Sequence, residues 1–123
     1  MTFYKLRQLQ FECDTWKRML SFMVDENIHL KNRLSEILSD QQQNQLLNEI
    51  EDYQTRFLKI DELIRILRND VAELEQSIKE KQDTTDNPSI NNKLSRIRLN
   101  IPLVERQLER MKMDFNSFLL IHS

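Results

Sequence analysis

The chain has 123 residues, a formal net charge of −2 and no glycine. A charge this close to neutral gives no overall attraction to nucleic acid or to an anionic membrane. The missing glycine excludes the P-loop and the dinucleotide-binding fingerprint, because the backbone of those phosphate-binding loops requires glycine. At this length we expect one domain, spanning residues 1–123, with a modest core.

Hydrophobic residues recur every three or four positions along almost the whole chain, which is the spacing of helices that pack side by side. The first stripe consists of Leu6, Leu9, Cys13, Trp16, Leu20, Met23, Asn27, Leu30, Leu34 and Ile37. Asn27 is the one polar side chain in this stripe. A buried asparagine at such a position lowers stability but selects the register and the number of partners.

The second stripe needs a helix of its own. It consists of Leu46, Ile50, Tyr53, Phe57, Ile60, Ile64, Leu67, Val71, Leu74 and Ile78. On one continuous helix the nine-residue step from Ile37 to Leu46 would place the two stripes on opposite sides. Ser39 with Gln42 matches a capping box, in which the hydroxyl accepts from an unpaired backbone N–H. We therefore predict a turn near residues 39–40, with helices at about 3–38 and 41–82.

The third stripe follows a polar segment, residues 83–87. It consists of Ile90, Leu94, Ile97, Ile101, Val104, Leu108, Met111, Phe115 and Phe118. Asn87 before Pro88 combines a good N-cap with a proline at the first helical position, which predicts a helix over about 88–120. Pro102 lies inside this helix. The stripe keeps its phase across it, which favours a kinked but continuous helix over a break into two shorter ones.

These elements predict an all-α fold: an antiparallel, up-down-up three-helix bundle or coiled coil with long helices. If the chain folds back near residue 40, residues of the first and second helices that lie opposite each other are equally far from the turn, so their numbers add to about 80. Asn27 then lies opposite Tyr53. The tyrosine hydroxyl would then satisfy the asparagine; a ligand-binding polar spot in the core is the alternative. A return near residue 85 sets Phe57 against Met111. Aromatic side chains then gather at the end that holds the first turn.

Charge is unevenly distributed. Residues 39–87 carry six basic and twelve acidic side chains (−6), whereas residues 88–123 carry six basic and three acidic ones (+3). We expect the basic third helix to dock against the acidic middle one. The alternative is that the third helix binds nucleic acid or an anionic surface. Glu105 and Glu109 interrupt its basic residues, which lie on two sides of the helix: Lys93, Arg96, Arg98, Arg106, Arg110 and Lys112.

Few residues have the chemistry of an active site. Cys13 is the only cysteine, so it forms no internal disulfide, and its place in the stripe predicts a core thiol. Glu26 and His29 match the Glu-x-x-His pair of di-iron bundles, but that pair does not recur, and His122 is the only other histidine. We therefore predict no catalytic residues, no metal site and no cofactor, and we do not expect an enzyme.

Apolar side chains also occur outside the three stripes, in excess of what one slender bundle can bury. They favour a non-enzymatic coiled-coil interaction protein, that is a scaffold, adaptor or assembly subunit, which binds a protein partner or a second copy through helix faces. The candidate interface residues are Phe22, Val24, Ile28, Leu58, Ile66 and Leu103.

The remaining expectations concern the chain ends and the compartment. Residues 118–121 form an apolar run that we expect to pack against Leu34, Ile37 and Leu38 rather than to enter a membrane surface. No apolar stretch is long enough to span a bilayer, and no signal-peptide hydrophobic region follows the first basic residues. We therefore expect a cytoplasmic protein.

Overall fold

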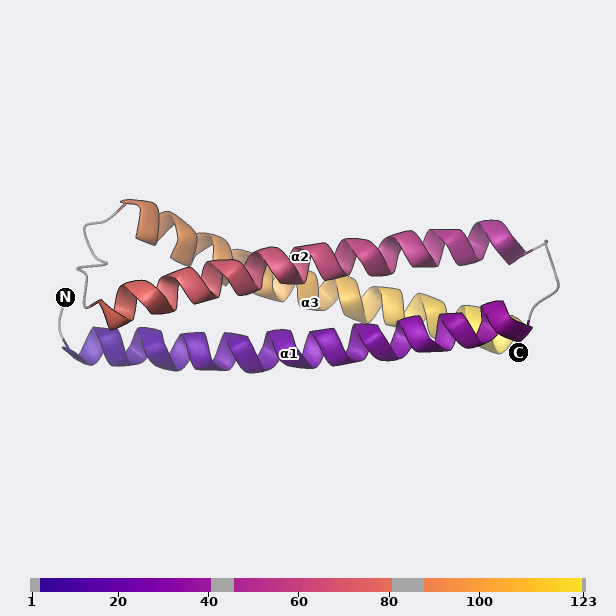
Figure 1. The fold of residues 1–123 in the computed structure, drawn as a ribbon, viewed down its shortest axis with the longest axis horizontal. Helices are drawn as coiled ribbons and strands as arrows, with labels where there is room; N and C mark the ends of the chain where they lie inside the picture. The colour runs from indigo at the N-terminus through magenta and orange to yellow at the C-terminus, as the bar shows by residue number, and fades with distance from the viewer. Residues whose placement is uncertain (1–2, 41–45, 81–87, 123) are drawn as a thin grey trace.

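The computed structural model describes residues 3–40, 46–80 and 88–122. It contains α1 (Phe3–Asp40), α2 (Leu47–Lys79) and α3 (Pro88–His122). Figure 1 shows the three helices side by side along one long axis, with α1 and α3 running in the same direction and α2 in the opposite one. The predicted all-α, up-down-up three-helix bundle is confirmed.

Most residues of the three stripes form one buried core, and the others pack half-buried against it: Leu6, Ile37, Tyr53 and Leu94. Trp16 and Phe57 both belong to it, as the side-by-side packing requires. Aromatic rings gather near the start of α2, where Phe115 lies 5.1 Å from the Tyr53 ring and 5.3 Å from the Phe57 ring, both edge to face. This arrangement is the one that aromatic pairs prefer, because a ring edge is positive and a ring face negative.

The predicted capping box at Ser39 is wrong. Ser39 lies inside α1, and its hydroxyl donates to the Ser35 carbonyl at 3.1 Å. The hydroxyl is thus used within its own helix, which continues to residue 40. α2 begins after Leu46, whose side chain caps no backbone N–H, and it ends at Lys79. It is therefore shorter than the predicted 41–82; Gln42 lies outside the described residues.

α3 begins at Pro88, as predicted, and runs two residues beyond the predicted end, to His122. Asn87, its predicted N-cap, lies outside the described residues. The helix is continuous across Pro102, which confirms the continuous alternative. Pro102 is exposed while Ile101 and Val104 are buried. On this outer side of the helix, water can reach the Arg98 carbonyl that the proline leaves without its usual donor.

The register between α1 and α2 differs from the predicted one. Polar contacts join Asn27 to Phe57 and Asp61, and Lys17 to Glu75, so that opposed residue numbers add to 84–92 rather than to about 80. The shift is close to one heptad. It follows from the helix ends: α1 stops at residue 40 and α2 starts at 47, so the middle of the connection lies near 43.

The other two registers agree with the bundle. Tyr53 bonds to Asp114 and Asp70 to Arg96, so the numbers of opposed residues on α2 and α3 add to 167 and 166. The predicted pairing of Phe57 with Met111 corresponds to a sum of 168. α1 and α3 are held by two ion pairs, Glu12 with Arg98 and Glu26 with Lys112. Both pairs are 86 residues apart in the chain, so one constant offset relates the heights of the two parallel helices.

Candidate functional site

Asn27 is the polar centre of the core. Its side chain is 0% exposed. Its Nδ2 donates to the Phe57 carbonyl at 3.0 Å and to Asp61 Oδ1 at 2.6 Å. The other oxygen of Asp61 accepts from Lys31 Nζ at 2.7 Å. A buried amide in α1 is thus linked through a half-buried carboxylate of α2 to an ammonium group at the edge of the bundle.

Tyr53 is not the partner of Asn27, so this predicted contact is wrong. The Tyr53 hydroxyl donates to the Asp114 carbonyl at 3.1 Å and so joins α2 to α3. The reason is the shift of about one heptad between α1 and α2, which brings Phe57 and Asp61, one and two turns further along α2, opposite the asparagine.

The Asn27 Oδ1 atom has no hydrogen-bond partner among the described residues. Burying such an oxygen unpaired costs roughly 1–3 kcal/mol. This cost argues against a stabilising role and favours a role in register. The Phe57 carbonyl and the Asp61 carboxylate both lie opposite Asn27 only when α1 and α2 are in this one alignment.

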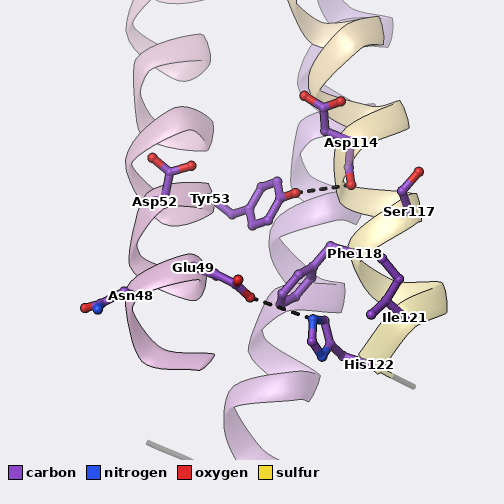
Figure 2. Close-up of a pocket in the computed structure, with 9 residues that line it drawn as sticks. All are labelled: Asn48, Glu49, Asp52, Tyr53, Asp114, Ser117, Phe118, Ile121 and His122. Carbon is purple, nitrogen blue, oxygen red and sulfur yellow. Dashed lines mark hydrogen bonds and ion pairs between the residues drawn. The ribbon is translucent and has the colours of Figure 1, made fainter. Parts of the chain in front are cut away.

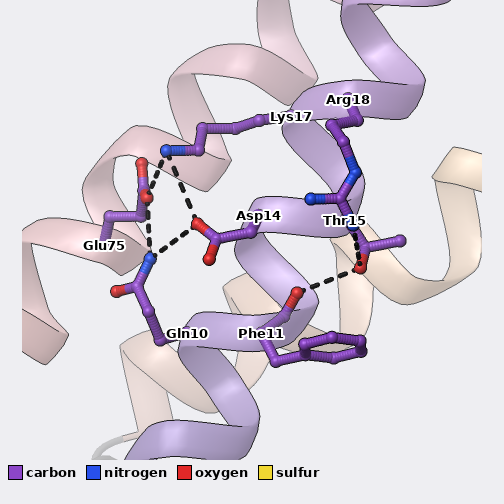
Figure 3. Close-up of polar contacts among 7 residues, drawn as sticks. All are labelled: Gln10, Phe11, Asp14, Thr15, Lys17, Arg18 and Glu75. Atoms are coloured by element: carbon purple, nitrogen blue, oxygen red, sulfur yellow. Dashed lines mark hydrogen bonds and ion pairs between the residues drawn. The ribbon is translucent and has the colours of Figure 1, made fainter.

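The edge between α1 and α2 is held by a polar cluster (Figure 3). Glu75 of α2 accepts from Lys17 Nζ at 2.8 Å and from Gln10 Nε2 at 3.1 Å. Asp14 accepts from the same Gln10 group at 3.0 Å. The Phe11 ring points from the side of α1 away from Glu75. The two sides of α1 therefore differ in chemistry: one is joined to α2 by charges, and the other carries an aromatic ring.

Two basic residues of α3, Lys93 and Arg96, dock on the acidic α2, as expected from the charge distribution. The Arg96 guanidinium donates two bonds to the buried Asp70 carboxylate, at 3.0 and 2.9 Å. Lys93 pairs with Glu73 and lowers the pKa of that carboxyl below its ordinary value. These contacts use two of the basic side chains that the alternative of nucleic-acid binding would need.

Not every basic side chain of α3 faces α2. Arg98 reaches Glu12 at 2.6 Å, and Lys112 reaches Glu26 at 3.2 Å, both across to α1. Arg106 and Arg110 are exposed and have no ion pair within the described residues. They are the basic groups of α3 left for an outside partner.

A hollow of about 550 Å³ lies between the start of α2 and the end of α3 (Figure 2). Its aromatic wall is formed by Tyr53 and Phe118, and burial raises the pKa of the Tyr53 hydroxyl. Carboxylates lie at the rim, and Glu49 is 3.7 Å from His122 Nε2. Such a hollow suits a cation. A cation of the protein already lies beside this wall, because the Arg56 guanidinium is 5.3 Å from the Tyr53 ring centre.

The structure separates the side chains with catalytic potential, which are Cys13 and the Glu26–His29 pair. The Cys13 thiol is fully buried, and desolvation, followed by the negative charge of Glu75, raises its pKa to about 12. It is therefore protonated at neutral pH and is a poor nucleophile. Glu26 pairs with Lys112, while His29 is exposed. In the described part of the chain, no three His, Cys, Asp or Glu side chains lie close enough to hold a metal ion.

Five of the six candidate interface residues are exposed, and Val24 is half-buried against the core. Val24 and Ile28 lie on the edge of α1 that faces α2, next to the Asn27 contacts. Leu58 lies at the same height on α2, since its number and that of Ile28 add to 86, within the observed α1–α2 range. These three residues therefore flank one helix–helix contact.

The other three candidates lie elsewhere. Ile66 and Leu103 flank the contact between α2 and α3, and their numbers add to 169, which places them at one height. Phe22 lies on the side of α1 next to α3 and is 64% exposed. The six residues therefore lie on three sides of the bundle. Three of them lie beside the α1–α2 contact, two beside the α2–α3 contact, and Phe22 lies on the side of α1 next to α3.

Large apolar side chains are exposed on the outer sides of α1 and α3. We call this surface the α1–α3 face and define it by Phe11, Phe22, Leu99, Met113 and Leu120, which are 63–81% exposed. A hollow of about 500 Å³ on this face lies between Phe22, Arg33 and Leu119. Sequence reasoning missed Phe11. Its signal was its distance of eleven residues, close to three full turns, from Phe22, which puts both rings on the same side of α1.

The apolar run at the end of α3 packs only in part. Phe118 is buried and Leu119 is half-buried, but Leu120 and Ile121 are 81% and 75% exposed. The expected packing of the whole run on α1 is therefore wrong for its last two residues. The reason is their position: an apolar run longer than two residues extends beyond the inward side of a helix.

None of the described helices has both the length and the apolar character needed to cross a bilayer. Comparison of the chain with protein-family models, with curated proteins and with solved structures finds no match. The surface chemistry of the three helices is therefore the basis for a proposal about function.

Proposed function

We propose that this is a non-enzymatic helical interaction protein, a scaffold, adaptor or assembly subunit, which binds another protein or a second copy through its helix faces. The observation that carries the proposal is the α1–α3 face, where five large apolar side chains are mostly exposed outside a complete core. We propose the cytoplasm as its compartment, because its one cysteine is a free buried thiol.

The exposed area supports this proposal. The chain exposes 8340 Å², whereas a compact monomer of 15.0 kDa would expose about 7,000 Å². Burying one large apolar side chain stabilises a complex by about 1.5–3 kcal/mol. Covering several of them offsets much of the entropy lost on association, which costs roughly 4–15 kcal/mol.

Rigidity also supports it. The ion pairs of Glu12 with Arg98 and of Glu26 with Lys112 hold α1 and α3 at a fixed offset. The apolar groups of the α1–α3 face are therefore presented on two long helices joined by a common core. A preformed surface loses less conformational entropy on binding than a flexible one, which favours affinity.

The second candidate function is binding of nucleic acid or an anionic surface through α3. It is favoured by the exposed Arg106 and Arg110, which have no ion pair within the described residues. Glu105 and Glu109 lie among them, and Lys93 and Arg96 are already paired with α2. We rank it second because a phosphate backbone needs several free basic groups on one surface.

The test compares salt dependence with surface variants. We expect association, measured as light-scattering mass over a dilution series and as proteins captured by the immobilised chain, to persist at about 0.5 M salt. A variant with Phe22→Ser and Met113→Ser should lose it. The matched control, Leu58→Ser with Ile66→Ser, changes two exposed apolar residues elsewhere and should keep it.

Two results would contradict the proposal. One is a chain that stays monomeric and captures no protein whose binding is lost in the variant with Phe22→Ser and Met113→Ser. The other is association that disappears at high salt and is insensitive to both pairs of substitutions. That second result would favour phosphate contacts, because these weaken steeply as salt rises.

A further inference from the structure

We propose that the α1–α3 face binds the same face of a second copy of this chain, antiparallel and related by a two-fold axis. This inference rests on the proposed function and narrows it by naming the partner. In such a dimer α1 lies on α1 and α3 on α3 of the second copy, and each contact occurs twice.

The two-fold centre can be located from the charges. The ion pairs that join α1 to α3 are both 86 residues apart. A two-fold axis that crosses α1 between residues 21 and 22 therefore crosses α3 between residues 107 and 108, because these points lie at the same height along the bundle. Residue 21.5 is also the midpoint of α1, which spans Phe3–Asp40. An axis at this height lets two copies overlap over almost their full length.

Opposite charges on α1 are placed symmetrically about that centre. Arg18 and Asp25 are both exposed, seven residues apart on one side of the helix, and equally distant from residue 21.5. An antiparallel copy brings Arg18 against Asp25 of the second copy, and Asp25 against its Arg18. A face with this pattern attracts its own antiparallel copy.

The apolar groups match the same axis. Phe11, 68% exposed, is carried to the height of residue 32, beside the hollow that His29, Arg33 and Leu119 line. Phe22 lies next to the axis and meets Phe22 of the second copy. The ring of one copy therefore enters the hollow of the other, twice, around a central aromatic pair.

The available area is sufficient. Thirty-five helical residues are about 52 Å long, and two helices side by side are about 20 Å wide. The face therefore offers about 1,000 Å² per copy, which exceeds the roughly 800 Å² per partner that a stable complex buries.

Cross-linking tests the position of the axis. In a Phe22→Cys variant, the new thiols of the two copies lie next to the axis, and mild oxidation should give a disulfide-linked dimer on a non-reducing gel. The native Cys13 is buried and protonated, so the wild-type chain should give none. Leu58→Cys is the matched control: Leu58 is 61% exposed but lies on another side, so it should also give none.

Charge exchange tests the pairing. Arg18→Glu sets like charges against each other twice and should weaken the dimer about tenfold at low salt. Adding Asp25→Arg restores opposite charges in the antiparallel dimer only, and should recover the wild-type dissociation constant. Helix content and melting temperature of the single variant serve as controls for folding. A double variant no better than the single one would overturn the antiparallel pairing.

The outcomes separate this inference from the proposed function. If the chain is monomeric at all concentrations but binds a different protein in a way that depends on Phe22 and Met113, the self-pairing is wrong and the proposed function stands. A dimer in which Phe22→Cys fails to cross-link also overturns the self-pairing alone. If neither the chain itself nor any captured protein binds through this face, both proposals fail.

Discussion

At the scale of single residues, Asn27 shows how a local pattern can predict a role without predicting the contacts. Its position in the first stripe predicted burial and a function in register, and it is 0% exposed. Its partner could not be found from the stripe, because identifying it required the α1–α2 alignment to better than one heptad. The Phe57 carbonyl, which accepts its hydrogen bond, is a backbone group that side-chain pairing does not reveal.

Replacing this residue should stabilise the monomer fold and loosen its specificity. Asn27→Leu removes the unpaired buried oxygen and should raise the free energy of unfolding by about 1 kcal/mol, a few degrees in melting temperature. Loss of the contacts to Phe57 and Asp61 should broaden the distribution of oligomers measured by light scattering.

The control is Leu20→Asn, one heptad earlier in the same stripe. It buries a second amide away from the Asp61 carboxylate and should lower the melting temperature. A lower melting temperature for Asn27→Leu with an unchanged mass would contradict a role in register.

At the scale of helices, the existence and type of all three elements were predictable, whereas several of their ends were not. The stripes depend on local spacing, which no tertiary contact alters. Ser39, in contrast, had two local uses for its hydroxyl: to cap a following helix or to bond back to the carbonyl four residues earlier. It takes the second. α1 ends two residues later and α2 begins six residues later than predicted, and together these changes moved the centre of the connection and shifted the opposed residues by about a heptad.

Pro102 gives a prediction at this scale. Pro102→Ala should restore the hydrogen bond to the Arg98 carbonyl and relieve the clash with the proline ring. It should raise the free energy of unfolding by at most about 3 kcal/mol, because part of that cost is already relieved at the solvent side.

The matched control is Pro88→Ala. Pro88 is the first residue of α3, where the missing N–H would have no partner in the helix, so the change should be close to neutral. Urea unfolding measures both variants. Equal effects at the two prolines would show that position in the helix does not decide the cost.

At the scale of the whole molecule, charge counting predicted the attraction of α3 to α2 but not how the charges are shared. Lys93 and Arg96 do dock on α2, while Arg98 and Lys112 hold α1. The apolar surface was predicted to exist, yet its residues were placed on one surface when they lie on three sides. Assigning a side chain to a side requires the neighbours of each helix, and a single sequence does not give their order around the bundle.

The network of charges between helices predicts how the whole molecule responds to acid. Lys93 lowers the pKa of Glu73 below its ordinary value in the folded state. The stabilisation it provides is therefore present above the pKa of the unfolded chain, near 4.5, and is lost as pH falls through the lower, folded pKa. The melting temperature should be constant near neutral pH and should fall below about pH 4.5.

Glu73→Gln should lower the melting temperature slightly at pH 7, and the variant and wild-type curves should converge below the folded pKa. Asp52→Asn changes an exposed acid with no ion pair among the described residues and is the matched control for the loss of one carboxylate. A Glu73→Gln curve that stays parallel to the wild-type curve would show that the Lys93 pair contributes nothing to stability in solution.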